Sequence, residues 1–354
     1  MKKSAVFTIG VLLAISCYSQ VNEPVKNIIL LIGDGMGVAQ VYAGYTANKG
    51  QLNLQRSQYS GFSITYSSSD YITDSGAGAT AIATGKKTYN GAIGVDSEGM
   101  PVKTILETAR DKGFGTGLVA TCDITHATPA SFVAHDTSRN DYEAIAMDFV
   151  GSGIDLFIGG GRDRFEKRSD SVNVSDMLRE KGYSVTYSLD SLKGENEGKA
   201  ACMVADVHLL PVLQGRGNYL PEATSIALNR LAENKNGFFI MIEGSQIDWG
   251  GHANNLDYIK TEMVDFDKAV GVAFDFADKN PGTLVIVTAD HETGGLALVD
   301  GSLETGAVTG AFGTTNHTAV MVPVFSYGTG AALFAGMYQN TDIYYKMLKV
   351  FETK

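Results

Sequence analysis

The sequence contains few cysteines and few prolines. Its three cysteines in 354 residues exclude a fold held together by several disulfides. Cys122 and Cys202 lie in apolar, strand-like stretches, so we expect two separate buried thiols; one disulfide between them is the alternative. With only seven prolines, no proline-rich linker divides the chain, and no internal repeat is found. These absences favour one domain rather than separate modules.

Basic residues are also in the minority. There are 28 lysines and arginines against 39 aspartates and glutamates, which gives a net charge of −11. This balance disfavours a nucleic-acid-binding surface and adsorption to anionic lipid. It does not exclude an anionic substrate, because a bound metal ion supplies its own local positive charge.

One apolar run stands close to the N-terminus. Two lysines precede the apolar residues 5–15, and small and polar residues follow over 16–20. This layout predicts a secretory signal peptide over residues 1–19, a mature domain over 20–354, and a periplasmic or secreted protein. The alternatives are a lipoprotein signal, which would put a lipid anchor on Cys17, and a buried N-terminal strand or helix. No other segment is apolar enough to span a membrane.

Short β-rich runs alternate with helical patterns along the chain. The expected strands are Asn27–Ile32, Gly115–Ala120, Asp155–Ile158, Ala201–Ala205, Gly237–Ile242 and Thr283–Thr288. The expected helices are Val102–Lys112, Val174–Lys181, Leu220–Glu233, Asp257–Asp278 and Asp342–Phe351. Several strands are nearly continuous apolar runs, as is typical of parallel strands buried on both faces. The pattern predicts an α/β fold with a largely parallel central sheet and helices on both faces.

Three of the expected strands deliver acidic residues at their C-terminal ends. Asp34 follows the first strand, Glu243 ends the fifth, and Asp290 with His291 follows the sixth. A lone acid at a strand end is commonly a turn or cap residue. Because open α/β sheets bind ligands at the C-terminal ends of their strands, three such ends indicate a site.

Ser75 stands where a polar turn passes into an Ala-rich helical stretch. The N-terminus of a helix offers unpaired N–H groups and the positive end of the helix dipole, which suits a serine that becomes phosphorylated. On its own, the position would equally suit an N-cap serine. A G-x-S-x-G motif is absent here, which disfavours an ordinary Ser-His-Asp hydrolase.

Metal-type residues cluster in the last third of the chain. Asp248 and His252 lie four residues apart, Asp290 and His291 are adjacent, and His317 follows. These clusters contain three of the six histidines, and imidazole with carboxylate suits zinc. With the acids at the strand ends, the set could hold more than one metal ion.

From Asn27 to the C-terminus, the sequence resembles the alkaline phosphatases. The segments that carry the resemblance appear in the family's order: Gly33-Asp34-Gly35-Met36-Gly37, Asp74-Ser75, His126-Ala127-Thr128-Pro129, Thr137-Ser138-Arg139, Glu243-Gly244, Asp248 with His252, Asp290-His291 and His317. The resemblance implies the alkaline phosphatase fold. It also implies hydrolysis of phosphate monoesters to phosphate and an alcohol, through a phosphoserine on Ser75.

The resemblance further implies two zinc ions and one magnesium ion. The first zinc would be held by Asp248, His252 and His317. The second would be held by Asp34, Asp290 and His291. The magnesium would be held by Asp34, Thr128 and Glu243. Arg139 would clamp the phosphate, and Asp74 would lie beside the nucleophile.

Two positions differ from the enterobacterial pattern of the family. His126 stands where those members have aspartate, and Trp249 stands where they have lysine, as in some marine and cold-living bacterial members. Both residues are expected close to the substrate and the third metal site, so that site is open to magnesium or zinc. His135 and His208 match no ligand position and are expected to be structural.

The remaining expectations concern substrates, partners and rivals. The family site grips phosphate and leaves the alcohol outside, so a broad range of small phosphorylated substrates is expected, and family members commonly form homodimers. A sulfatase is disfavoured because Ser75-Gly76-Ala77-Gly78-Ala79 lacks the proline and arginine of that motif. A catalytically inactive metal-stabilised binding protein is disfavoured by the complete ligand set.

Overall fold

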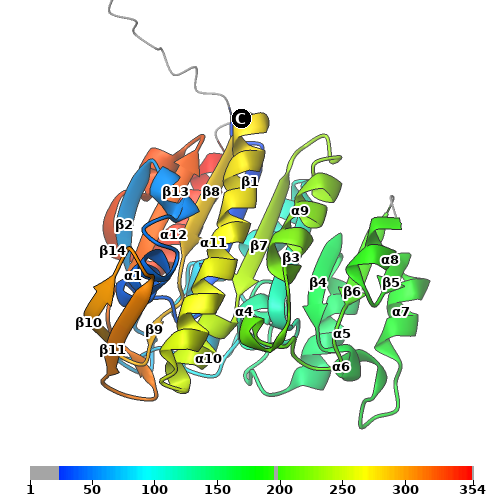
Figure 1. Cartoon of the computed structure of the whole chain (residues 1–354). Helices are drawn as coiled ribbons and strands as arrows, with labels where there is room; N and C mark the ends of the chain where they lie inside the picture. The colour runs from blue at the N-terminus through cyan, green and yellow to red at the C-terminus, as the bar shows by residue number, and fades with distance from the viewer. Residues whose placement is uncertain (1–23, 195–197, 353–354) are drawn as a thin grey trace, which may run out of the picture.

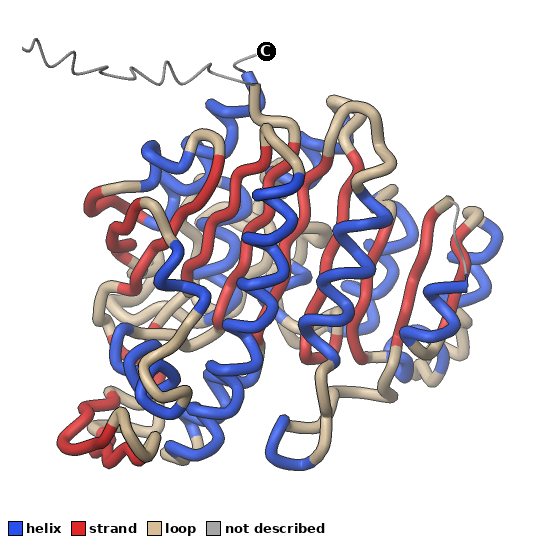
Figure 2. Tube along the Cα trace, turned by 45° about the horizontal axis from the view of Figure 1, so that its top comes forward, coloured by secondary structure: helices blue, strands red, loops and turns tan. Residues whose placement is uncertain are grey.

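The computed structural model describes residues 24–194 and 198–352. The expected signal peptide and Cys17 lie outside this part of the chain. Figure 1 shows one broad central sheet with helices packed along it, and Figure 2 shows helices on both sides of the strands. In the described residues, no helix is long and apolar enough to cross a membrane.

The central sheet has ten strands. Across the sheet they are β14 (Gly336–Gln339), β2 (Tyr59–Ile64), β13 (Val322–Gly328), β8 (Thr283–Thr288), β1 (Asn27–Gly33), β7 (Phe238–Gly244), β3 (Gly115–Asp123), β4 (Leu156–Gly160), β6 (Lys199–Met203) and β5 (Tyr183–Thr186). Within the described residues, β13 is the only strand of this sheet that runs antiparallel to its neighbours. The predicted largely parallel sheet is therefore confirmed.

Alternate side chains of the central strands enter two separate cores. In β1, Ile28, Leu30 and Ile32 pack into one core, and Ile29 and Leu31 pack into the other. All seven residues of β1 are buried, as expected of a strand covered on both faces.

Helices cover both faces of the sheet. One core includes residues of α2 (Ser75–Thr84), α3 (Ile105–Asp111), α4 (Ala127–Ala130), α5 (Tyr142–Ser152), α6 (Arg162–Glu166), α7 (Val174–Glu180) and α12 (Asn340–Glu352). The other includes residues of α1 (Val38–Ala47), α8 (Leu189–Gly194), α9 (Tyr219–Leu231), α10 (Gln246–His252) and α11 (Leu256–Lys279).

Two small pairs of antiparallel strands lie beyond the C-terminal ends of the central strands. One joins β10 (Leu296–Ser302) to β11 (Ala307–Phe312), and the other joins β9 (Glu292–Thr293) to β12 (His317–Thr318). The second pair matters for the site, because His317 lies opposite Thr293 and is thereby brought close to the end of β8.

The expected strands and helices are present with shifted ends. The helix expected from residue 102 begins at Ile105, because the Thr104 hydroxyl caps it and Glu107 completes a capping box. Strand β2, whose first side chains are exposed, was not predicted, and neither were β5, β13 and β14.

Candidate active site

The three acid-bearing strand ends meet in the middle of the sheet. Strands β8, β1 and β7 are neighbours, and Ile32 lies opposite both Glu243 and Thr288. The residues just beyond these positions are Asp34 and Asp290, so the carboxylates converge as predicted. Asp34, Glu243 and Asp290 are all fully buried.

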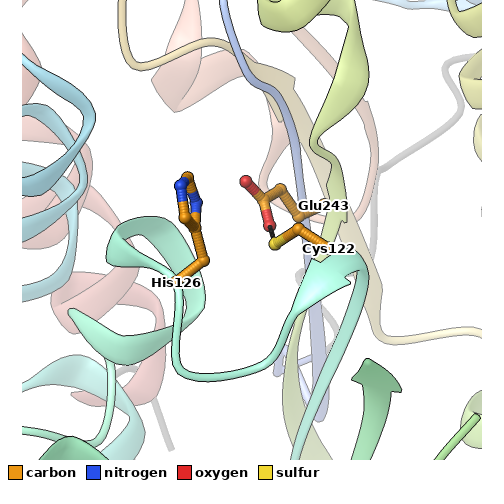
Figure 3. Close-up of side chains that lie close together, drawn as sticks. All are labelled: Cys122, His126 and Glu243. Carbon is orange, nitrogen blue, oxygen red and sulfur yellow. Dashed lines mark hydrogen bonds between the residues drawn. The ribbon is translucent and has the colours of Figure 1, made fainter. Parts of the chain in front are cut away.

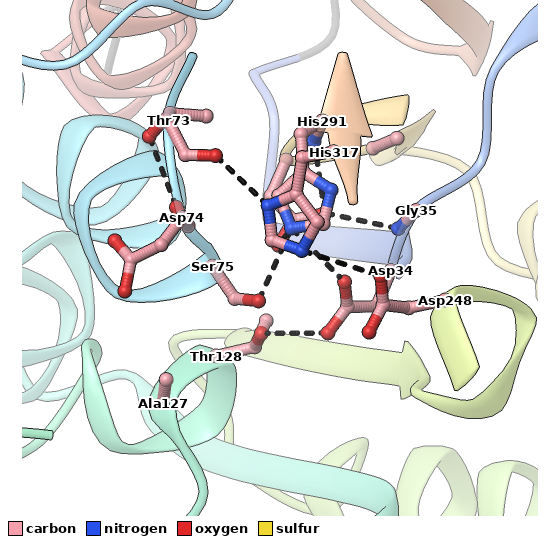
Figure 4. A network of polar contacts seen from close by, with 12 residues as sticks. Asp34, Gly35, Thr73, Asp74, Ser75, Ala127, Thr128, Asp248, His291 and His317 are labelled. Carbon is pink, nitrogen blue, oxygen red and sulfur yellow. Dashed lines mark hydrogen bonds and ion pairs between the residues drawn. The ribbon is translucent and has the colours of Figure 1, made fainter. Parts of the chain in front are cut away.

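Ser75 is the first residue of α2. The Asp74 side chain caps this helix by accepting a hydrogen bond from the Ala77 N–H at 2.9 Å. All ten residues of α2 are buried, which its glycines and alanines allow; a Cβ on Gly78 would lie 3.1 Å from the Asp290 carbonyl oxygen. The helix thus places the Ser75 hydroxyl 3.1 Å from His291 Nε2, as Figure 4 shows.

A first metal-type group contains Asp248, His252 and His317. The Nδ1 atoms of His252 and His317 lie 2.6 and 2.9 Å from the carbonyl oxygens of Thr315 and Thr73. A carbonyl only accepts, so in the neutral rings both Nδ1 atoms carry the proton. The two Nε2 lone pairs then face each other at 3.1 Å, beside the Asp248 carboxylate. A cation between these three groups would relieve the repulsion.

A second metal-type group contains Asp34, Asp290 and His291, all fully buried. Asp34 Oδ1 and Asp290 Oδ2 lie 3.4 and 3.3 Å from His291 Nε2 and have no hydrogen-bond donor among the described residues. Burial, together with the carboxylates of Asp290 and Asp248, raises the pKa of Asp34 well above its usual value. Burial likewise lowers the pKa of His291. Orphaned carboxylate oxygens facing a neutral imidazole fit a divalent cation.

Thr293 joins these two groups, and the sequence analysis assigned it no role. Its hydroxyl donates to Asp248 Oδ1 and lies 3.2 Å from His291 Nδ1. Because the hydroxyl hydrogen is directed to Asp248, the oxygen accepts from the His291 Nδ1–H. This contact fixes the lone pair of His291 on Nε2, toward Ser75. The nearby signal in the sequence was the Thr293-Gly294-Gly295 stretch, which begins two residues after His291.

The residues expected to hold magnesium also lie together. The Thr128 hydroxyl lies 3.5 Å from Asp34 Oδ2, and Glu243 is buried with Oε1 unpartnered within the described structure. Burial raises the pKa of Glu243 to about 7. An all-oxygen set of this kind fits magnesium.

His126 and Trp249 lie beside this third group. Their ring centroids are 6.4 Å apart, and His208 packs 4.8 Å from Trp249. His208 Nδ1 accepts from the Asp123 backbone N–H at 3.0 Å, in keeping with the structural role expected for it. Burial, with Arg139 and His208 nearby, lowers the pKa of His126, so this imidazole is neutral.

Arg139 reaches the site from the turn after α4. Its Nη1 lies 2.8 Å from Asp74 Oδ2, and its Nη2 lies 3.4 Å from His126 Nε2. Helix α4 ends at Ala130, and the chain continues as turns. The segment returns the chain to the site, and Arg139 lies next to Asp74, the residue that caps α2.

Comparison with known proteins agrees with this geometry. A family model described as alkaline phosphatase matches residues 25–311. Alkaline phosphatase 4 of Bacillus subtilis is 34% identical, over 94% of this chain and 91% of its own length. The alkaline phosphatase from the Antarctic bacterium TAB5 matches with a TM-score of 0.88 and 43% identity, over 92% of this chain and 98% of that chain. A histidine-to-aspartate variant of the TAB5 enzyme, with Mg bound in its M3 site, matches with the same TM-score at 42% identity, with the same coverage.

Proposed function

Because this chain belongs to the alkaline phosphatase family and is a phosphomonoester hydrolase, we propose that Ser75 is its nucleophile and that metal ions surround it. The observation that carries the proposal is the position of Ser75. Its hydroxyl stands at a capped helix N-terminus, 3.1 Å from His291 Nε2. A helix N-terminus favours the negative charge that develops on an attacked phosphoryl group.

Each metal-type group is assigned to one ion. Asp248, His252 and His317 hold one zinc, and Asp34, Asp290 and His291 hold a second. Their nitrogen and carboxylate donors, and the unpartnered oxygens of Asp34 and Asp290, support this assignment. When bound, such ions lower the pKa of a contacted hydroxyl or water and stabilise negative charge on oxygen.

Magnesium is assigned to the third group, which contains Asp34, Thr128 and Glu243. Their oxygen donors support this choice. The Mg in the M3 site of the TAB5 variant is consistent with it. His126 and Trp249 lie beside the group and adjust its charge and access.

The reaction then proceeds in two displacements at phosphorus. Ser75 Oγ forms a bond to phosphorus as the bond to the leaving alcohol oxygen breaks, which gives a phosphoserine. Water then forms the new bond to phosphorus, and the Ser75 Oγ–P bond breaks to release phosphate. Because the serine hydroxyl must lose its proton before it attacks, activity is expected to rise toward alkaline pH.

Arg139 binds the non-bridging oxygens of the phosphoryl group throughout. Asp74 accepts from Nη1 and so holds the planar guanidinium at the mouth of the site. A guanidinium binds two phosphate oxygens side by side. A monoester has three non-bridging oxygens and nearly two negative charges, so it uses this contact more fully than a diester does.

The test compares a monoester with a diester. Arg139→Ala should lower kcat/KM for an aryl phosphate monoester roughly 10- to 150-fold, which corresponds to a loss of about 1.5–3 kcal/mol in transition-state stabilisation. It should lower hydrolysis of the matching diester much less. Asp74 keeps its hydrogen bonds from Ala77 and Gly91, so the α2 cap survives. Arg179→Ala, on the exposed face of α7, is the control and should change neither rate. Equal losses for both esters would show that Arg139 is only structural.

Location and assembly follow as parts of the same proposal. The lysines and apolar run at the N-terminus support export to the periplasm or the medium. A homodimer acting on small phosphorylated substrates is proposed from the family membership.

A further inference from the structure

A thiol lies among the polar side chains of the third group. Cys122, near the end of β3, lies close to Glu243 on the neighbouring strand β7 and to His126, the residue that precedes α4 (Figure 3). One ligand atom from each of the three side chains lies within 4.8 Å of the other two. The register of β3 and β7 creates this proximity, since Ala120 lies opposite Glu243.

Two polar atoms of this cluster have no hydrogen-bond partner among the described residues. They are His126 Nδ1 and Glu243 Oε1, and both are buried. The other Glu243 oxygen, Oε2, lies 3.4 Å from Cys122 Sγ. Arg139 approaches His126 only at Nε2, at a long 3.4 Å, so it leaves Nδ1 available. Buried groups of this kind usually have a partner, so the cluster is built to receive one.

We propose that a thiophilic divalent cation of the Zn²⁺ type binds to the Cys122 thiolate, an imidazole nitrogen of His126 and a Glu243 oxygen. Sulfur and nitrogen donors select zinc, cobalt or cadmium over magnesium, which prefers oxygen alone. Binding releases the thiol proton to solvent, and a water molecule can complete four-coordination.

This site shares only Glu243 with the oxygen set assigned to magnesium. The inference rests on the proposed function in one respect only, the assignment of magnesium to Asp34, Thr128 and Glu243. Because one carboxylate serves both sets, a thiophilic ion and magnesium compete there. The metal bound at Glu243 would therefore depend on the ratio of the two metals. Cys122, which none of the expected ligand sets includes, would cause this dependence.

The chain offers a matched control in its other buried cysteine. Cys202 is buried on β6, where its Sγ lies 3.5 Å from the Ser188 carbonyl oxygen. It belongs to no metal-type group of the described residues.

The experiment is a cobalt titration of the full-length, metal-stripped protein, followed by absorption spectroscopy. We expect the ligand-field bands of cobalt at the histidine-rich groups, and with further cobalt a thiolate-to-cobalt charge-transfer band. Cys122→Ser should lose the charge-transfer band and keep the ligand-field bands, which show that the variant is folded. Cys202→Ser should keep both. Excess Mg²⁺ should diminish the charge-transfer band.

Two results would overturn the proposal. One is a wild-type protein that binds cobalt without a charge-transfer band, and the other is a band that persists in Cys122→Ser. The readout requires no turnover, so a parallel aryl phosphate assay separates the two proposals. Phosphatase activity without the band removes only the thiolate site, whereas the band without activity removes the proposed function.

Discussion

Among single residues, Thr293 connects two of the metal-type groups, because its hydroxyl donates to Asp248 Oδ1 and lies 3.2 Å from His291 Nδ1. The candidate ligand residues could be predicted, because imidazoles and carboxylates at strand ends carry recognisable chemistry. Thr293 carries no such chemistry by itself. It acts through its position, since its one hydroxyl orders both Asp248 and His291. A side chain whose importance lies in which two groups it joins becomes visible only once the chain is folded.

Thr293→Val should weaken metal binding. The substitution keeps the shape of the side chain but removes the hydroxyl that holds both ligands, and losses of such supporting contacts cost about 10- to 100-fold in metal affinity. Thr293→Ser, which keeps the hydroxyl, should stay close to wild type. The measurement is zinc affinity by competition with a chelating dye, alongside activity at saturating zinc. Equal zinc affinity in all three proteins would show that Thr293 only fills space.

At the level of elements, the turn region after α4 is held in place by a histidine–glutamate contact. His135 Nε2 lies 3.4 Å from Glu107 Oε2, in the capping box of α3, and His135 Nδ1 lies 2.6 Å from the Gly94 carbonyl oxygen. These contacts direct the chain toward Arg139. This contact could not be predicted from the sequence, because it joins residues 28 positions apart.

His135→Gln should destabilise the protein at mildly acidic pH and much less at alkaline pH. The hydrogen bond to Glu107, opposed by burial, raises the pKa of His135 above 6.5. The stabilisation is therefore present below pH 6.5 and is lost as pH rises through the folded-state pKa. Burial would raise the pKa of Glu107, but hydrogen bonds from His135 and Thr104 outweigh burial and lower this pKa. The stabilisation from Glu107 is therefore present above pH 4.5 and is lost as the pH falls through its folded-state pKa.

The check is thermal unfolding of wild type and His135→Gln at pH 5.5 and pH 9, at matched saturating zinc and magnesium. We expect a difference of about 0.5–1 kcal/mol at the lower pH, as for a partly exposed ion pair, and a smaller one at pH 9. The opposite pH trend would contradict a charged His135.

Over the whole molecule, the fold was the most predictable level. The order of apolar strands and amphipathic helices predicted the parallel sheet and its covered faces. Strand β2, the edge strand β14 and the antiparallel β13 were not predicted; β2 and β14 are partly exposed and lack continuous apolar runs. The sheet gathers Asp34, Glu243 and Asp290 at its buried centre, where burial and the neighbouring carboxylates raise the pKa values of Asp34 and Asp290, so we expect stability to depend on bound cations.

Metal removal should therefore lower the melting temperature and abolish activity together. A ligand that binds only the folded state adds RT ln(1 + [L]/Kd), about 2.7 kcal/mol at 100 times its Kd. The loss should be reversed by zinc with magnesium. Protonation of the ligands competes with the metal, so the restored stability should fall toward acidic pH. Calorimetry of chelated and reloaded protein, with metal content verified, is the measurement. An unchanged melting temperature and full activity in verified metal-free protein would contradict the assigned sites.

The central claim, that Ser75 carries the phosphoryl group, is tested most directly by trapping the intermediate. Enzyme turning over a labelled phosphate monoester is quenched in acid, digested, and mapped by mass spectrometry. We expect the label on Ser75 in wild type, no label in Ser75→Ala, and unchanged labelling in Thr73→Ala, which removes the nearby hydroxyl. Label on another residue, or equal labelling of wild type and Ser75→Ala, would contradict the assignment of Ser75 as the nucleophile.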